Sequence, residues 1–326
     1  MRAQLARIYA GDTNIDFIGK RKLWFALSGV LMVTFALLLG LRGLEFGIEF
    51  RGGVSTQAPI EDAELADASV AEIESAVRAA LTPVGAQDAQ VQIVTDDDGR
   101  SVLVQTEEGD PETQSEIVSS VAEAVGTDVA STDSQRIGSK WGGEITRKAF
   151  QALVVFIIVV FAFISFRFEW KMAAAAVVAL VHDLMLTAGV YSLLGFEVTP
   201  STVIAILTIL GYSLYDTVVV FDKVEENIDL LAASGRVTYE SGANRALNQV
   251  FMRSFNTSLS TLLPVAALLF VGSGLFGAET LEDLALALFV GLLLGSYSSI
   301  YIATPFLSLL KEREPKYRGI RERRDK

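Results

Sequence analysis

The sequence contains no cysteine and only one histidine, and these absences remove whole classes of chemistry. Without cysteine the chain forms no disulfide, carries no thiol nucleophile and offers no thiolate to a metal ion. His182 leaves little room for a zinc site made only of protein side chains, because such sites combine several ligands. A phosphate-binding loop of the form G-x-x-x-x-G-K-[S/T] is also missing, so an ATP-driven step would reside in another protein. We therefore expect neither a metal nor a cofactor.

Long stretches of the chain also lack charge. Hydrophobic residues make up 51% of the sequence, and they gather in runs long enough to cross a bilayer, which takes roughly 20 helical residues. One such run is compatible with a buried core helix, but six of them indicate an integral membrane protein. The predicted transmembrane helices are Leu23–Leu41, Ala149–Phe166, Met172–Leu194, Ser201–Phe221, Phe255–Leu275 and Leu284–Leu307. No small-residue cleavage site follows the first run, so it is interpreted as a retained signal anchor.

Lysine and arginine are absent from two short loops, Gly195–Pro200 and Gly272–Asp283. Positive residues flank the opposite ends of the spans instead. Cytoplasmic loops of membrane proteins carry the excess of Lys and Arg, so both termini are predicted to be cytoplasmic. The basic tail is interpreted as a topology anchor, with anionic lipid or ribosomal RNA as alternative contacts. The expected order is a cytoplasmic N-terminus (1–22), span one (23–41), an extracytoplasmic domain (44–148), spans two to six (149–307) and a cytoplasmic tail (308–326).

Most of the acid behind the net charge of −12 lies between Glu45 and Glu144, in the segment predicted outside the cytoplasm. Alternating or helical spacing of its apolar residues predicts strands and helices. In chain order they are a strand (Val54–Pro59), a helix (Ala68–Leu81), two strands (Ala89–Thr95 and Ser101–Thr106) joined by a turn at 96–99, a helix (Glu112–Val125) and a strand (Ser131–Ile137). The order β-α-β-β-α-β is typical of a ferredoxin-like α+β domain. Such a domain either binds a substrate or partner or caps the bundle.

Charged residues within the apolar runs are candidate functional residues, because a charge in the bilayer core is costly and usually marks function. Asp183, preceded by His182, lies near the middle of span three, and Asp216 lies inside span four. Asp222 ends span four and is interpreted as a boundary charge. Arg253 enters span five from the same side of the membrane, so an Asp216–Arg253 pair is feasible in depth. Such a pair is either a movable proton-binding switch or a static contact that holds helices together.

Blocks of this sequence resemble, in the same order, those of a known family. The blocks are Phe46-Gly47-Ile48-Glu49-Phe50-Arg51-Gly52-Gly53, Val181-His182-Asp183, the stretch GYSLYDTVVVFDK at 211–223, Arg253 through Ser258 with Thr261, and 291–299. The pattern departs from the usual one at Glu49, Tyr215, Lys223 and Ser254-Phe255, while Asp216 and Arg253 are retained. On these blocks the chain is similar to the SecF family, whose members partner SecD in bacterial protein export.

The resemblance implies a half of an RND-like transport unit that uses the proton gradient to promote preprotein export across the cell membrane. The implied partners are a SecD homologue, the SecYEG channel, YajC, YidC, the translocating preprotein and membrane lipids, but no nucleic acid. No enzymatic activity is implied. Residue by residue, Asp216 would be the proton-binding carboxylate and Arg253 its partner, with His182 and Asp183 as secondary proton-coupling residues.

Two other functions remain open on the sequence. One is an RND-type exporter of lipids or small molecules that acts without Sec. The other is a structural or sensory membrane subunit that binds partners and moves no protons.

Overall fold

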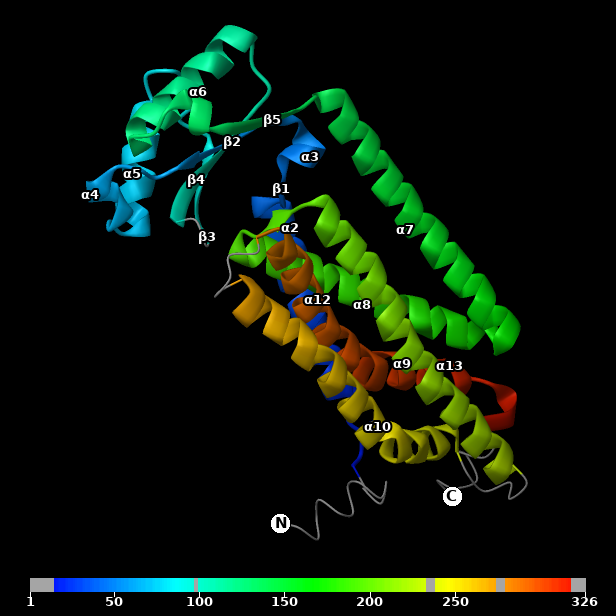
Figure 1. Cartoon of the computed structure of the whole chain (residues 1–326). Helices are drawn as coiled ribbons and strands as arrows, with labels where there is room; N and C mark the ends of the chain where they lie inside the picture. The colour runs from blue at the N-terminus through cyan, green and yellow to red at the C-terminus, as the bar shows by residue number, and fades with distance from the viewer. Residues whose placement is uncertain (1–14, 97–98, 233–237, 274–278, 318–326) are drawn as a thin grey trace.

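The computed structural model describes residues 15–96, 99–232, 238–273 and 279–317. Long helices form a bundle, and a small α+β domain stands at one end of it (Figure 1). We call the opposite end of the bundle the distal end. Parts of the predicted N-terminus and tail, at 1–14 and 318–326, lie outside the described residues.

Six helices of the described chain are long and apolar enough to cross a membrane, which confirms the predicted number of spans. The first three are α2 (Arg21–Arg42), α7 (Ser139–Arg167) and α8 (Trp170–Leu194). The fourth is α9 (Pro200–Ala232), and the fifth is α10 (Tyr239–Ala267), which continues as the π-helix η2 (Leu268–Ser273). The sixth is α12 (Glu279–Ser298), which passes through the π-helix η3 (Ser299–Ala303) into α13 (Thr304–Lys311).

Several helices extend beyond the apolar runs that predicted them. Helix α7 begins at Ser139, ahead of Ala149, and α9 continues past Phe221 to Ala232. Hydropathy marks only the part of a helix that lies in hydrocarbon, whereas the hydrogen-bonded helical backbone continues into water. The predicted end of the fifth span, Leu275, lies outside the described residues.

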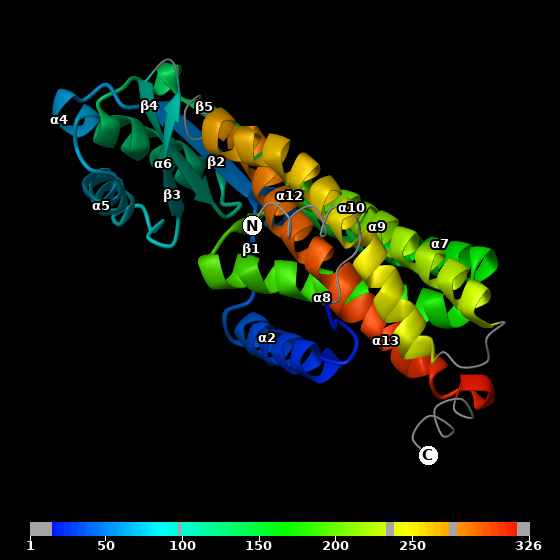
Figure 2. The same cartoon turned by 90° about the horizontal axis from the view of Figure 1, so that it is seen from below.

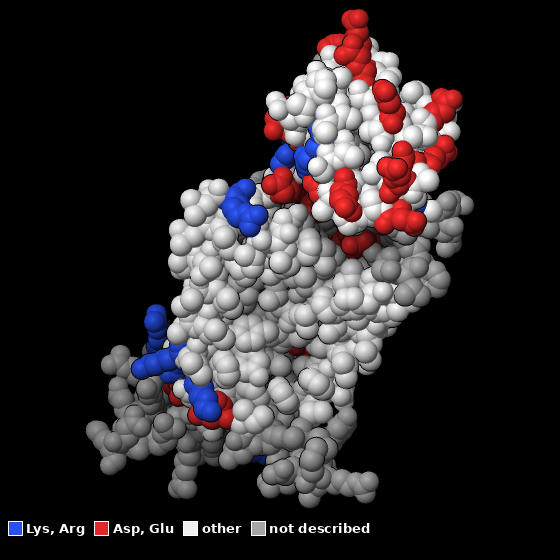
Figure 3. Space-filling model, turned by 90° about the vertical axis from the view of Figure 1, so that its left-hand side faces the viewer, with Lys and Arg blue, Asp and Glu red and all other residues white. Residues whose placement is uncertain are grey.

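On one face, the middle of the bundle is largely uncharged (Figure 3). On the face in Figure 3, Asp and Glu cover the α+β domain, Lys and Arg lie near the two ends of the bundle, and a broad uncharged band separates them. This distribution is the one expected of a protein whose middle faces lipid.

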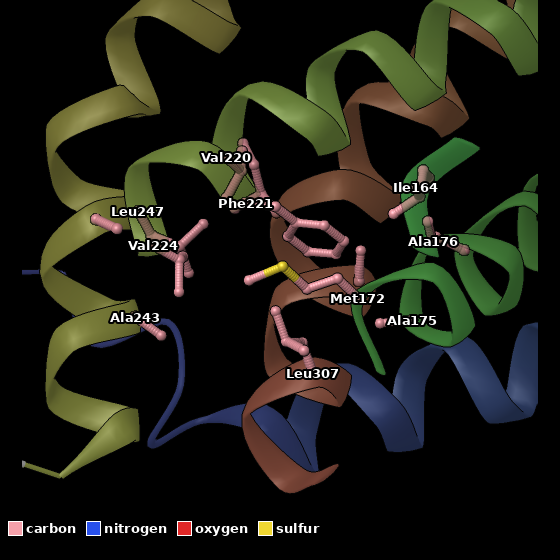
Figure 4. Close-up of a cluster of buried hydrophobic side chains, with 14 of the residues drawn as sticks. Ile164, Met172, Ala175, Ala176, Val220, Phe221, Val224, Ala243, Leu247 and Leu307 are labelled. Carbon is pink, nitrogen blue, oxygen red and sulfur yellow. The ribbon is translucent and has the colours of Figure 1, made fainter. Parts of the chain in front are cut away.

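Inside the bundle, close packing replaces the hydrophobic effect, which is weak between helices that lipid surrounds. A methyl group added at Gly189 of α8 would collide with the Phe35 ring of α2, so glycine allows these two helices to approach. Towards the distal end, Met172 of α8, Phe221 of α9 and Leu307 of α13 fill the core (Figure 4). These contacts join segments that lie far apart in the sequence.

The α+β domain lies between α2 and α7, and it has the predicted ferredoxin-like order. Its strands are β2 (Gly53–Pro59), β3 (Gln90–Asp96), β4 (Gly99–Thr106) and β5 (Asp133–Ile137). Its helices are α4 (Ala63–Ala66), α5 (Val70–Leu81), α6 (Pro111–Val125) and the 3-10 helix η1 (Val129–Ser131). The sheet order is β3-β4-β2-β5, and each neighbouring pair is antiparallel. Residues 97–98 of the predicted turn lie outside the described part of the chain.

Helix α5 illustrates how the local sequence builds this domain. Ser69 and Glu72 form a capping box, in which each side chain bonds to the backbone N–H of the other residue. Ile73, Val77 and Leu81 then recur at helical spacing, and all three are buried in the domain core. The cap fixes where the helix begins, and the apolar face fixes which side meets the sheet.

A short junction ties the α+β domain to the bundle. Strand β1 (Glu45–Phe46) lies parallel to β6 (Glu197–Val198), which belongs to the loop between α8 and α9. The Gly47 amide donates to the Val198 carbonyl (3.0 Å), and α3 (Ile48–Arg51) follows directly. A methyl group added at Gly47 would lie 2.5 Å from Glu49 Oε2 and 3.0 Å from Glu197 Oε1. A side chain at position 47 would therefore require these two carboxyl groups to move.

We expect Glu197 to make this junction sensitive to pH. Burial, together with the nearby charges of Glu49 and Asp283, raises the pKa of Glu197 from 4.5 to about 7. The closed junction then holds the proton more tightly than an opened one, so its stability is greatest below pH 4.5 and falls as the pH rises towards about 7. Deuterium exchange at the Gly47 amide, corrected for intrinsic exchange, should accelerate across that range. In Glu197→Gln the acceleration should disappear. A corrected exchange rate that does not change with pH in the wild-type chain would contradict the prediction.

Candidate functional site

Asp216 is buried in the middle of the bundle, on the face of α9 that meets α10. Its side chain is 7% exposed, and its Oδ1 atom accepts a hydrogen bond from Ser254 Oγ of α10 (2.7 Å). Its Oδ2 atom is buried and meets no hydrogen-bond partner among the described residues. One oxygen is thus held in place while the other is unoccupied. This arrangement lets the carboxyl bind or release a proton without losing its attachment to α10.

Asp183 lies in a second polar cluster, formed by α8, α9 and α12. Its Oδ2 atom accepts hydrogen bonds from Ser213 Oγ (2.7 Å) and Ser298 Oγ (2.8 Å). Its Oδ1 atom lies 3.3 Å from His182 Nδ1, and both residues are almost fully buried. Unlike Asp216, Asp183 has partners at both oxygens. Its contacts therefore join three helices at one point.

The π-helix η3 connects the two clusters. Ser298 bonds to Asp183, whereas Ser299 Oγ lies 2.9 Å from Thr217 Oγ1, next to Asp216 in the chain. Ser299 Oγ also donates to the Ser213 carbonyl (3.2 Å). Single π-turns inside helices are uncommon and occur often at functional sites. Here the irregular turn begins at two consecutive serines, of which Ser298 contacts Asp183 and Ser299 contacts Thr217. We call the two clusters together the polar layer.

Arg253 is exposed, and it forms no ion pair with Asp216 within the described part of the chain. Its charge still acts on Asp216 through space. The Arg253 side chain borders a groove of about 510 Å³ between α7, α9 and α10, which Asp222 also lines. Asp222 lies 3.7 Å from Arg167 Nη2, in keeping with its interpretation as a boundary charge. The structure thus brings Asp216 to Ser254 and His182 to Asp183, but it leaves Arg253 outside the polar layer.

The sequence alone assigns no role to the serines that contact the two carboxylates. Ser254 stands in it only as a departure from a family block, and Ser213, Ser298 and Ser299 only as members of such blocks. The available signal was their position within apolar runs, where a hydroxyl needs a partner in the protein. Their partners depend on helix rotation, which the sequence does not give.

Comparison with known proteins assigns the family. Residues 117–313 match the family described as Protein export membrane protein SecD/SecF, C-terminal. The sequence is 42% identical to the protein translocase subunit SecF of Streptomyces coelicolor, over 98% of this chain and 82% of that one. The chain belongs to the SecF family. SecF of Mycobacterium tuberculosis is also 42% identical, over 95% of this chain and 70% of that one.

A solved structure extends the SecF assignment to the fold. The crystal structure of SecDF from Thermus thermophilus, described as a translocon-associated membrane protein, matches with a TM-score of 0.79 and 32% identity. The match covers 93% of this chain but 39% of the SecDF chain, so this chain spans less than half of that protein. The SecF relatives are protein translocase subunits, and this chain is a membrane protein of the same kind.

Proposed function

We propose that this chain is one half of a proton-driven unit that promotes protein export through the Sec channel. In this proposal it pairs with SecD, and the pair acts with SecYEG, YajC and YidC on a preprotein that is crossing the membrane. The observation that carries the proposal is Asp216, which is buried, bonded to Ser254 at one oxygen and unpartnered at the other within the described chain. Such a carboxyl couples proton binding to the α9–α10 contact.

The other candidates take supporting roles in the proposal. Asp183 holds Ser213 and Ser298, so that with His182 it fixes the geometry on one side of the polar layer. Arg253 directly precedes Ser254, so a rotation of α10 by about 100° would exchange the hydroxyl for the guanidinium beside Asp216. The proton-coupling set is then Asp216, Arg253, His182 and Asp183, with Asp216 as the group that binds the proton.

SecD would then pack against α9 and α10. Thr208 and Tyr215 of α9 and Ser260 of α10 are exposed, and Tyr215 is 55% exposed. Polar side chains that face hydrocarbon are unfavourable, so such a surface is better covered by protein than by lipid. The greater length of the SecDF chain supports a partner of this kind.

We also propose that the distal end faces the cytoplasm and that the α+β domain lies outside the cell membrane. Arg21, Lys171 and Lys311 lie in the distal turns of their helices, whereas the loop 195–200 beside the domain has no Lys or Arg. The positive-inside rule then orients the bundle. Segments 1–22 and 308–326 would be cytoplasmic, and 44–148 would be the external domain.

Co-purification and reconstitution test the proposal together. A tagged chain expressed in its own cell should bring down SecD and SecYEG, and the complex in proteoliposomes should export a preprotein faster when a proton gradient is imposed. The control is the same preparation with a protonophore, which should reduce export to the rate without a gradient. Recovery without SecD and SecYEG, together with gradient-driven lipid or drug efflux, would favour the RND-type exporter instead. Recovery with both partners but no effect of the gradient would favour a structural subunit.

A further inference from the structure

The segment that precedes α2 lies along α10 at the distal end of the bundle, and we call Ile15–Lys20 the strap. The Ile15 amide donates to Asn248 Oδ1 (2.8 Å), and Asn248 Nδ2 donates back to the Ile15 carbonyl (2.9 Å). The Phe17 amide donates to Asn244 Oδ1 (2.8 Å), and Asn244 Nδ2 also donates to the Ile15 carbonyl (3.0 Å). Two asparagines one helical turn apart thus hold the main chain of the strap on one face of α10.

Side chains extend this contact in both directions along α10. Phe17 is 1% exposed, and the centroid of its ring lies 5.4 Å from that of Phe251. Arg21, the first residue of α2, forms an ion pair with Glu240 in the first turn of α10. The α10 residues that make these contacts recur every three or four positions, so they form one stripe along the helix. The strap therefore runs antiparallel to α10, from Asn248 to Glu240.

The strap is also attached to α2. It continues directly into this helix, and Trp24 Nε1 of α2 donates to the Phe17 carbonyl (3.2 Å). Beyond this end, α2 packs mainly against α8. Seen from the distal end, α2 lies at the edge of the bundle beside α8, across α12 from α10 (Figure 2). The strap thus joins two helices that the body of the bundle holds apart.

The two ends of this connection reach different parts of the molecule. Ser254, which bonds to Asp216, lies six residues after Asn248 on the same helix, about 9 Å along its axis. At its far end α2 stops at Arg42, and strand β1 of the junction begins at Glu45. A displacement of α10 at the polar layer therefore has a short route through the strap and α2 to the α+β domain.

We propose that the strap makes α2 move with α10, so that proton binding at Asp216 is transmitted through α2 to the α+β domain. Asn244 and Asn248 are then positioning residues, which act through the strap and do not touch the proton. The inference rests on the proposed function, in which the proton changes the α9–α10 contact. The asparagines bind main-chain groups, so a movement of α10 displaces the chain itself and not only a side chain.

Anchoring of the N-terminal segment alone explains these contacts less well. The side chains of Phe17 and Ile18 are each 1% exposed, so apolar burial already attaches the strap to the bundle. Apolar contacts have no preferred direction, and they allow one surface to slide along another. Hydrogen bonds are directional, and asparagine is an unfavourable residue inside a helix. Asn244 and Asn248 therefore add what burial lacks, a fixed register between the strap and α10.

Releasing the strap should separate proton flow from export. Asn244→Ala combined with Asn248→Ala removes the side-chain hydrogen bonds from α10 to the strap. In proteoliposomes with SecD and SecYEG, this double variant should lose the stimulation of export by a proton gradient. Proton entry driven by the gradient, followed with a pH-sensitive dye inside the vesicles, should continue. Asp216→Asn should lose both, which separates failure of the strap from failure of the coupling site.

Asn227→Ala is the matched control for the double variant. Asn227 is buried at the same end of the bundle, and its Nδ2 atom donates to Gln249 Oε1 of α10 (2.8 Å), so it joins α9 rather than the strap to α10. It should keep the stimulation. Stimulated export by the double variant would overturn the inference and leave the proposed function standing. Loss of proton entry together with export in that variant would also overturn it, since the asparagines would then only support the fold. A wild-type complex that ignores the gradient would refute the proposed function itself.

A reversible cross-link tests the strap when both asparagines are present. Asp16 and Arg245 are exposed and adjoin the bonded residues of the strap and of α10 in the chain. The chain has no cysteine, so Asp16→Cys with Arg245→Cys supplies its only two thiols. Joining them with a bismaleimide that contains a reducible disulfide should leave stimulated export unchanged. A block of export that disappears on reduction would show that the strap must detach from α10, and this would overturn the inference.

The same cross-link should rescue the released strap. In the chain with Asn244→Ala and Asn248→Ala, joining the two thiols restores the attachment to α10 by a covalent route. Stimulated export should return on cross-linking and be lost again when the spacer is reduced. Equal export before and after reduction would show that attachment of the strap carries nothing to the α+β domain.

Discussion

Export that depends on the proton gradient is expected to stop when Asp216 is replaced by Asn. The amide has nearly the same shape as the carboxyl, and its carbonyl oxygen can still accept the hydrogen bond from Ser254 Oγ. The amide nitrogen takes the position of the unpartnered oxygen, but it neither gains nor loses a proton at the pH of the export assay. The helices should therefore pack as before, while the α9–α10 contact no longer responds to protonation.

The measurement is the export rate in proteoliposomes with and without an imposed gradient, alongside the thermal unfolding of the complex. Asp216→Asn should export at the rate seen without a gradient and unfold at nearly the wild-type temperature. Asp222→Asn is the control, since it removes an exposed carboxyl from the same helix. Full gradient stimulation of Asp216→Asn would eliminate Asp216 as the coupling group. Equal losses in both variants would point to a general effect of charge on α9.

The sequence predicted the depth of each candidate residue but not the face of the helix that it occupies. Asp216 and Arg253 enter the membrane from the same end, and this made their pairing feasible. In the structure the neighbouring residue, Ser254, meets Asp216 instead. One residue turns the side chain by about 100° around a helix, and apolar runs that face lipid on one side and protein on the other give no clear amphipathic period. The rotational position of each helix could therefore not be predicted from the sequence.

The junction between the domain and the bundle was hidden for a different reason. Strands β1 and β6 each have two residues and lie far apart in the sequence. Alternation cannot be recognised over two residues, and parallel pairing depends on the surrounding fold. The α+β domain could be predicted from the sequence because α5, β3 and β4 are each long enough to show their periods. The irregular turn at η3 was likewise hidden, since nothing in Ser298-Ser299 distinguishes a π-turn from a regular helix.

A large loss of stability is expected when Asp183 is replaced by Ala. Its Oδ2 atom accepts hydrogen bonds from Ser213 and Ser298, and its Oδ1 atom lies beside His182 Nδ1. Removing the carboxyl takes this partner from Ser213 Oγ and His182 Nδ1, at about 1–3 kcal/mol for each unsatisfied group, whereas Ser298 Oγ can still donate to the Gly295 carbonyl (3.2 Å). The contacts that join α8, α9 and α12 would be lost at one point. We expect Asp183→Ala to unfold at a markedly lower temperature or to accumulate poorly in the membrane.

Asp183→Asn separates this structural role from proton transfer. The carbonyl oxygen of the amide can accept both serine hydroxyls, and its NH₂ group can donate to His182 Nδ1 in the matching tautomer. The fold should then survive, and gradient-driven export should remain close to that of the wild-type complex. If Asp183→Asn instead unfolds at the wild-type temperature but loses the response to the gradient, Asp183 itself must exchange a proton. Both carboxyl groups are buried, but only Asp183 has partners at both oxygens within the described chain. If Asp216→Asn loses the response to the gradient and Asp183→Asn keeps it, Asp216, the carboxyl with the unpartnered oxygen, is the coupling group.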